Sequence, residues 1–380
     1  MLDRRVPGHM NCICYDKIKM RYPFYIRGTI ILFGLCLLTL ALYTLRPVCI
    51  PFALATVIAM LLNPVVGWLE SKKINRVVAI TVTVVSSILL IVCIVWFIVS
   101  QSAHIAQDFP QMKLKFEKLF HNAQQWLNAE GNVSIKKQDE LIANARENLM
   151  PVLAGLAGSV LGSLTVIVLL PVYLFLLLYY KQLIVNFIYE VVNDQYAGKL
   201  DKVLNESKTA IQRYMSGLML ETLIVATLNS AALLLFGVKY AILIGVLGGL
   251  LNMIPYIGGI IAISLPVIVA TVTKDGFNTQ LGIIGAYLLI QFIDNHYLLP
   301  VIVSSKVRIN ALVSIVATIL AGMLWGITGM FLCIPLVGIL KIAFDRIPGM
   351  KPWGKLLGDE IPTIHRGILL KKRRKKVTVA

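Results

Sequence analysis

Long apolar runs are the feature of this sequence that most constrains its fold. Residues 28–45, 77–100 and 152–180 contain no charged side chain, and most of the last third of the chain is apolar as well. A helix needs about 20 predominantly apolar residues to cross the hydrocarbon core of a bilayer. Charged residues make up only 14% of the chain, whereas soluble domains carry roughly a quarter. The sequence therefore predicts an all-α integral membrane protein and excludes a soluble globular fold.

The hydropathy pattern divides the chain into seven parts. In order we expect a basic cytoplasmic N-terminus (1–27), transmembrane helices one to three (28–100), a helical extramembrane insert on the outer side (101–150), a fourth transmembrane helix (151–180), a cytoplasmic amphipathic helical region (181–216), a transmembrane transport core (217–345) and a basic cytoplasmic tail (346–380). The prediction is about six full transmembrane helices plus two elements broken by glycine and proline, at 240–273 and 309–345.

The distribution of charge predicts the orientation of the chain. The net charge is +17, and basic residues gather in the first 27 residues and in the run 371–376. Such flanks are typical of cytoplasmic segments beside membrane helices. We therefore expect a multi-pass protein of a bacterial inner membrane, with both termini in the cytoplasm and the lipid bilayer as its surroundings. No groove-reading module accompanies the charge, so nucleic acid is not an expected partner.

Nothing in the sequence points to an enzyme or to a bound cofactor. It contains no P-loop, no Gly-x-Ser-x-Gly elbow and no His-Glu-x-x-His pair. Cys12-x-Cys14 is an isolated pair that lacks two further ligands, so we interpret both as ordinary thiols and predict no metal site.

One short pattern recurs in the two broken elements. It reads Gly249-x4-Ile254-Pro255-x2-Gly258 in the first and Gly329-x4-Ile334-Pro335-x2-Gly338 in the second. Paired segments of this kind are a pointer to a transporter's binding site. They could be re-entrant hairpins or kinked but complete spans, and the loop charges slightly favour hairpins. The residues predicted to break the helices are Gly248, Gly249, Gly259, Gly326, Gly329 and Pro335.

Polar residues inside the predicted core are the candidates for a binding site. A carboxylate within a span costs roughly 2.5–3.5 kcal/mol and usually faces a bundle interior or a wet cavity. Asp294 is the leading candidate, for a cation, a proton or a hydrogen-bond donor of a substrate; the alternative is a structural polar contact between helices or a hydrated place near the interface. The full set of predicted substrate- or ion-binding residues is Asp294, Asn295, Gln291, Asn252, Pro255, Tyr256, Gly258, Glu221 and Asn229.

Several motifs of the last 170 residues resemble the autoinducer-2 exporter family of bacterial membrane proteins. They are Arg213-Tyr214-x2-Gly217, Phe236-Gly237-Val238-x-Tyr240-Ala241, Asn252-Met253-Ile254-Pro255-Tyr256-Ile257-Gly258 and Gln291-x2-Asp294-Asn295-x4-Pro300. The resemblance implies a secondary transporter or exporter that assembles as a homo-oligomer in the inner membrane. It does not fix the cargo. Many relatives have Glu where this chain has Asp294, which keeps the charge and shortens the reach.

Three functions remain open from the sequence. The first is an exporter of a small polar solute, such as an autoinducer-2-like signal. The second is a Na⁺(Li⁺)/H⁺ antiporter in which Asp294 alternates between proton and metal cation. The third is a non-transporting membrane scaffold that uses the 101–150 insert as a binding surface.

Overall fold

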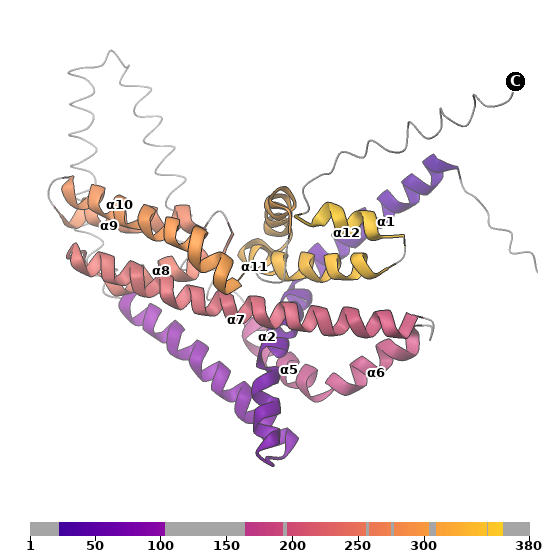
Figure 1. Cartoon of the computed structure of the whole chain (residues 1–380). Helices are drawn as coiled ribbons and strands as arrows, with labels where there is room; N and C mark the ends of the chain where they lie inside the picture. Colours follow the sequence, from indigo (N-terminus) through magenta and orange to yellow (C-terminus); the bar gives the residue numbers. More distant parts are fainter. Residues whose placement is uncertain are drawn as a thin grey trace, which may run out of the picture. The chain divides into compact units, whose positions relative to one another are not determined.

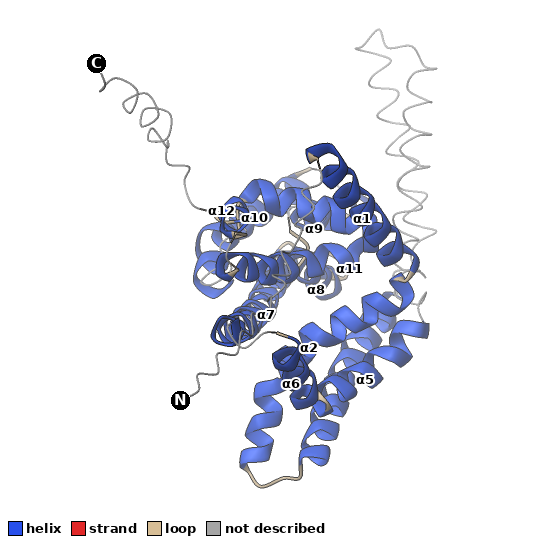
Figure 2. Ribbon diagram, turned by 90° about the vertical axis from the view of Figure 1, so that its right-hand side faces the viewer, coloured by secondary structure: helices blue, strands red, loops and turns tan. Residues whose placement is uncertain are grey.

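The computed structural model describes residues 23–102, 164–192, 196–255, 258–274, 277–303, 309–347 and 349–359. Nearly all of the predicted 101–150 insert, and most of both basic termini, lie outside these ranges. Within them the chain is helical and contains no strand, as Figure 2 shows. The prediction of an all-α fold is confirmed.

The first helices coincide with the predicted apolar runs. Helix α1 (Phe24–Thr44) belongs to a compact unit of its own that ends at Thr44. In the second unit, α2 (Arg46–Ser71), the helix Arg76–Ser102 and α5 (Leu164–Tyr179) share an apolar core. The Arg76 guanidinium donates to the carbonyl of Tyr179 at 2.9 Å. Between α5 and α6 (Lys181–Val191) the chain bends by 65°.

Helix α7 (Ala197–Leu235) is one unbroken helix of 39 residues. From the sequence we predicted an amphipathic region and a separate span for this stretch, because its composition changes near residue 217. The structure shows that the change of composition does not interrupt the helix. Helix α7 contacts α2, α8, α10 and α11, so it is the element that holds the second unit together (Figure 1).

The first broken element is a helical hairpin. Its arms, α8 (Ala241–Asn252) and α9 (Gly258–Thr273), pack against each other (Figure 1). At 1.5 Å per residue they are about 18 and 24 Å long, which is shorter than a hydrocarbon core of about 30 Å. The turn is tight at Gly258, where a Cβ would lie 1.9 Å from the Leu251 carbonyl oxygen. Helix α10 (Asn278–Ile293) follows and continues as a π-helix, η2 (Asp294–Val303).

The second broken element also reverses direction. Helix α11 (Ala311–Arg346) contains two non-helical residues, Trp325 and Gly326, the latter with φ 63° and ψ −145°. The Thr318 hydroxyl lies 3.1 Å from the Cys333 sulfur. These residues would be about 22 Å apart in a straight helix. The two halves of α11 are therefore antiparallel arms of a hairpin, and α12 (Lys351–Leu357) follows the second arm.

Only one of the six predicted break positions lies at a break. Gly326 forms the turn of α11, whereas Gly248 and Gly249 lie inside α8, Gly259 lies inside α9, and Gly329 and Pro335 lie inside the second arm of α11. Most of these glycines instead allow close packing; a Cβ on Gly249 would lie 2.6 Å from the Cβ of Ala226. The two Ile-Pro patterns are therefore not structurally equivalent.

Five described helices are long and apolar enough to cross a membrane, and a sixth is added if α5 and α6 count as one bent span. One of the five is α11, which folds back on itself. The described residues thus form a polytopic helical protein with two hairpins beside a long central helix.

Candidate functional site

Three helices bring together two carboxylates and an amide. Asn252 is the last residue of α8, immediately before the turn of the first hairpin. Its Nδ2 donates to Asp294 Oδ2 at 2.8 Å and lies 3.3 Å from Glu221 Oε1. Glu221 comes from α7 and Asp294 from the junction of α10 and η2. A single amide at a helix break therefore bridges two acidic side chains that lie 73 residues apart in the sequence.

Both carboxylates are removed from solvent. Glu221 and Asp294 are each 2% exposed. Glu221 Oε2 and Asp294 Oδ1 have no hydrogen-bond partner among the described residues, and the ion pairs found in the same ranges involve neither acid. Buried charge is costly unless it is paired and hydrogen-bonded. The cluster is therefore suited to a proton, a cation or a cargo that donates hydrogen bonds.

Gln291 and Asn295 lie at the edge of this cluster. Gln291 Nε2 is 3.4 Å from Asp294 Oδ2 and 3.5 Å from Asn295 Oδ1. Gly259 makes room for the amide, because a Cβ there would lie 2.7 Å from Gln291 Oε1. Gln291, Asp294 and Asn295 are spaced i, i+3 and i+4, which would put them on one face of an α-helix, but Asp294 is buried and Asn295 is exposed. The π-helix that begins at Asp294 changes the angular spacing that an α-helix would give.

A second polar group lies two turns further along α7. Asn229 is 2% and Tyr287 5% exposed, and within the described ranges neither Asn229 Oδ1 nor the Tyr287 hydroxyl has a partner. A Cβ on Gly248 would be 3.1 Å from Asn229 Nδ2 and 3.8 Å from the Tyr287 hydroxyl. Glycine therefore keeps space between these groups. Tyr287 was not among the predicted site residues, although its seven-residue spacing from Asp294 places both on one face.

Apolar clusters lie at both ends of this polar stretch of α7. At one end Leu218 packs with Val57 and Leu332 from α2 and α11. At the other end Leu233 packs with Ile244 and Ile283 from α8 and α10. The polar residues thus occupy a section of the helix interface between two apolar clusters.

The remaining predicted site residues belong to the hairpin turn. Pro255 is half-buried just after Asn252, and Gly258 begins α9. Tyr256 lies outside the described residues. Of the nine predicted residues, the structure brings Glu221, Asn252, Asp294 and Gln291 into one hydrogen-bonded group and places Asn229 further along α7.

Broken helices around a buried polar site define a class of protein. Half-helices that end beside carboxylates in a multi-pass helical fold are typical of secondary membrane transporters. The family model for AI-2E family transporters matches residues 31–349, and this chain belongs to that family.

Named relatives agree with this class. The chain is 28% identical over 322 residues to the AI-2 transport protein TqsA of Escherichia coli K12, covering 82% of this chain and 89% of that protein. It is 26% identical over 314 residues to the putative transport protein YueF of Bacillus subtilis 168, covering 78% and 83%. The putative permease PerM of Escherichia coli K12 is 31% identical over 197 residues, which cover half of this chain. The protein is a multi-pass membrane transporter, and its relatives are named as transport proteins and permeases rather than as enzymes.

Proposed function

We propose that this protein exports a small polar solute and that the Glu221–Asn252–Asp294 cluster binds it. The observation that carries the proposal is the pair of carboxylates, each 2% exposed, joined by the amide that ends α8. A cluster that served only as a contact between helices would be expected to satisfy its own oxygens. Here one oxygen of each acid has no described partner.

The chemistry of these oxygens supports a donor-bearing cargo. Glu221 Oε2, Asp294 Oδ1 and Asn229 Oδ1 are acceptors, and the Tyr287 hydroxyl can donate or accept. Glu221 and Asn229 are two turns, about 12 Å, apart on α7, so a solute with several hydroxyl or amine hydrogens would pair with more of these oxygens than one metal ion, whose ligands lie within about 2.5 Å. The name of the relative TqsA refers to AI-2 transport, so AI-2 is the first solute to test.

We also propose a homo-oligomer in a bacterial inner membrane with both termini in the cytoplasm. The basic residues at both ends of the sequence support this orientation. The contact between Glu206 and Arg346 joins the N-terminal part of α7 to the end of α11, which supports a position of both on the same side of the membrane.

The test is solute efflux from proteoliposomes that contain the full chain. We expect Asp294→Asn and Glu221→Gln each to slow AI-2 efflux by about tenfold, because an amide nitrogen replaces a carboxyl oxygen that accepts from the cargo and leaves a buried donor unpaired, at a cost of about 1–3 kcal/mol. Glu206→Gln is the matched control on α7, since its ion pair with Arg346 lies at the surface. Exposed pairs contribute only about 0–1 kcal/mol.

The same vesicles separate export from antiport. Proton movement driven by Na⁺ or Li⁺ gradients, lost in Asp294→Asn, would favour the antiporter. Efflux that is equal in wild type, Asp294→Asn and Glu221→Gln would refute the assigned site.

A further inference from the structure

Helix α12 has an apolar face that no described residue covers. Met350, Trp353 and Leu356 are 41%, 61% and 58% exposed. They follow one another at intervals of three residues, so they share one side of the helix. A short helix with an exposed tryptophan directly after a membrane hairpin is suited to the interface between lipid and water.

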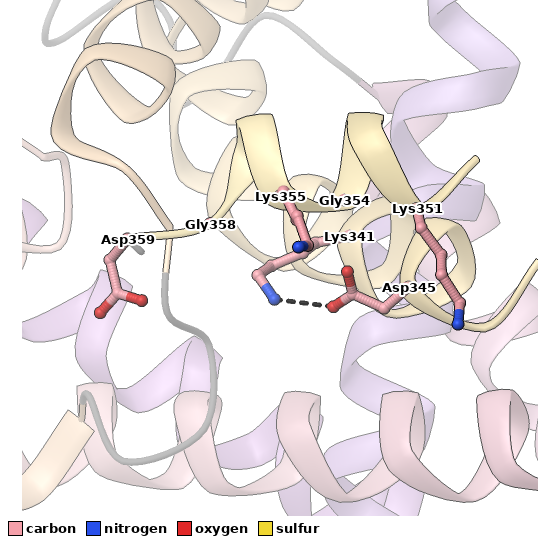
Figure 3. A pocket seen from close by; sticks show the side chains of 7 residues that line it. All are labelled: Lys341, Asp345, Lys351, Gly354, Lys355, Gly358 and Asp359. Atoms are coloured by element: carbon pink, nitrogen blue, oxygen red, sulfur yellow. Dashed lines mark hydrogen bonds and ion pairs between the residues drawn. The ribbon is translucent and has the colours of Figure 1, made fainter. Parts of the chain in front are cut away.

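The opposite face of α12 lines a cavity against the end of α11. The cavity has a volume of about 360 Å³, and its lining residues are drawn in Figure 3. Lys351 and Lys355 come from α12, and Lys341 and Asp345 come from α11. Gly354 lets the two helices approach, because a Cβ there would lie 2.1 Å from Asp345 Oδ1.

The charges around this cavity are unequal. The Lys341 ammonium donates to Asp345 at 2.8 Å, so these two groups neutralise each other. In the described part of the chain no carboxylate pairs with Lys351 or Lys355, and Asp359 is the only other acid of the lining. The cavity therefore offers two ammonium groups to an anion and retains net positive charge.

We propose that this cavity binds the phosphate headgroup of an anionic phospholipid. The ammonium groups of Lys351 and Lys355 hold the phosphate, while Trp353 and Leu356 lie in the interfacial layer of the same leaflet. This arrangement fixes the end of the second hairpin at the membrane surface. Free phosphate presents the same charge, but Trp353 and Leu356, on the opposite side of this one short helix, favour a ligand that brings an acyl region with it.

The experiment measures lipid bound to the purified full-length protein by native mass spectrometry. The protein is equilibrated with phosphatidylglycerol or with zwitterionic phosphatidylcholine. The variant is K351Q/K355Q, and its control is K202Q/K208Q, which removes two exposed lysines from the N-terminal part of α7. All four positions are exposed, so both variants keep the core intact.

We expect wild type and K202Q/K208Q to retain phosphatidylglycerol in preference to phosphatidylcholine. K351Q/K355Q should bind phosphatidylglycerol roughly 25-fold more weakly, since each lysine near an anionic surface contributes about a fivefold change. Equal retention by the two double variants would overturn the proposal. Displacement of the lipid by inorganic phosphate at the same concentration would also overturn it, because the ligand would then be free phosphate.

A second measurement reports on the apolar face. In a variant that keeps Trp353 as its only tryptophan, acyl-brominated phosphatidylglycerol should quench the fluorescence more strongly than brominated phosphatidylcholine does. Equal quenching by the two lipids would contradict selective binding beside α12. Neither measurement involves transport, so the outcome is independent of the proposed export function.

Discussion

A disulfide between the two arms of α11 would test the second hairpin directly. The Thr318 hydroxyl oxygen and the Cys333 sulfur are 3.1 Å apart. In Thr318→Cys a sulfur replaces that oxygen, and a small rotation of either side chain brings the sulfurs to the bonding distance of about 2.05 Å. A continuous transmembrane helix would separate the same positions by about 22 Å. The difference between hairpin and straight helix is thus far larger than side-chain motion can bridge.

The assay oxidises Thr318→Cys in membranes and identifies the linked peptides by mass spectrometry. Cys333 is the only native cysteine retained; those replaced are Cys12, Cys14, Cys36, Cys49 and Cys93. Val316→Cys is the control, because its side chain is 46% exposed and lies away from the facing arm. We expect nearly complete linkage in the first variant and little in the second.

Closure of this 15-residue loop should also stabilise the oxidised protein by about 3 kcal/mol. Reducing agent should reverse the gain in a thermal unfolding experiment. Absence of linkage in Thr318→Cys, or equal linkage in Val316→Cys, would refute the hairpin and restore a span through residues 311–346.

Three further predictions test local features of the fold. Gly326→Ala should destabilise the protein by about 1–3 kcal/mol, because φ is 63° there. The control Gly285→Ala has open space at its Cβ and should be neutral or stabilise the protein by up to about 1 kcal/mol. Equal unfolding temperatures for these two variants would contradict the prediction. Asn252→Leu should lower the free energy of unfolding by about 2–4 kcal/mol, since two buried carboxylates lose their shared donor. A denaturant titration in which this variant is as stable as wild type would show that the amide is dispensable. Gly249→Val should prevent α8 from packing against Ala226 and lower the folded yield by size-exclusion chromatography; a monodisperse wild-type profile would disprove the tight contact.

The apolar runs and the leading site residue could be predicted from sequence because each depends on local composition. A span of lipid-exposed helix needs a continuous apolar segment, and Asp294 is conspicuous inside one. The association of Asp294 with Glu221 was not predicted. It depends on how α7 crosses α10 and η2, and no local pattern in either segment records that crossing.

The positions of the helix breaks were the least predictable feature. Glycine and proline mark places where a helix is free to break, but neither requires it to do so. Pro335 lies within the second arm of α11, whereas the turn falls nine residues earlier at Gly326. Gly248 and Gly249 looked like a break because the sequence does not show that Asn229 and Ala226 approach them from α7.

The close packing of α7 on α8 holds two of the site residues on adjoining helices. A Cβ on Gly245 would lie 2.2 Å from the Ser230 hydroxyl oxygen, and one on Gly249 would lie 2.6 Å from the Cβ of Ala226. Small residues at this four-residue spacing let helix backbones approach and pack as a unit. Glu221 and Asn252 therefore lie on two closely packed helices, and Asp294 comes from a third element. If the site opens between α8 and η2, the 2.8 Å hydrogen bond from Asn252 to Asp294 must break. Asp294 then loses a donor, and a cargo that donates a hydrogen bond to Asp294 would take its place.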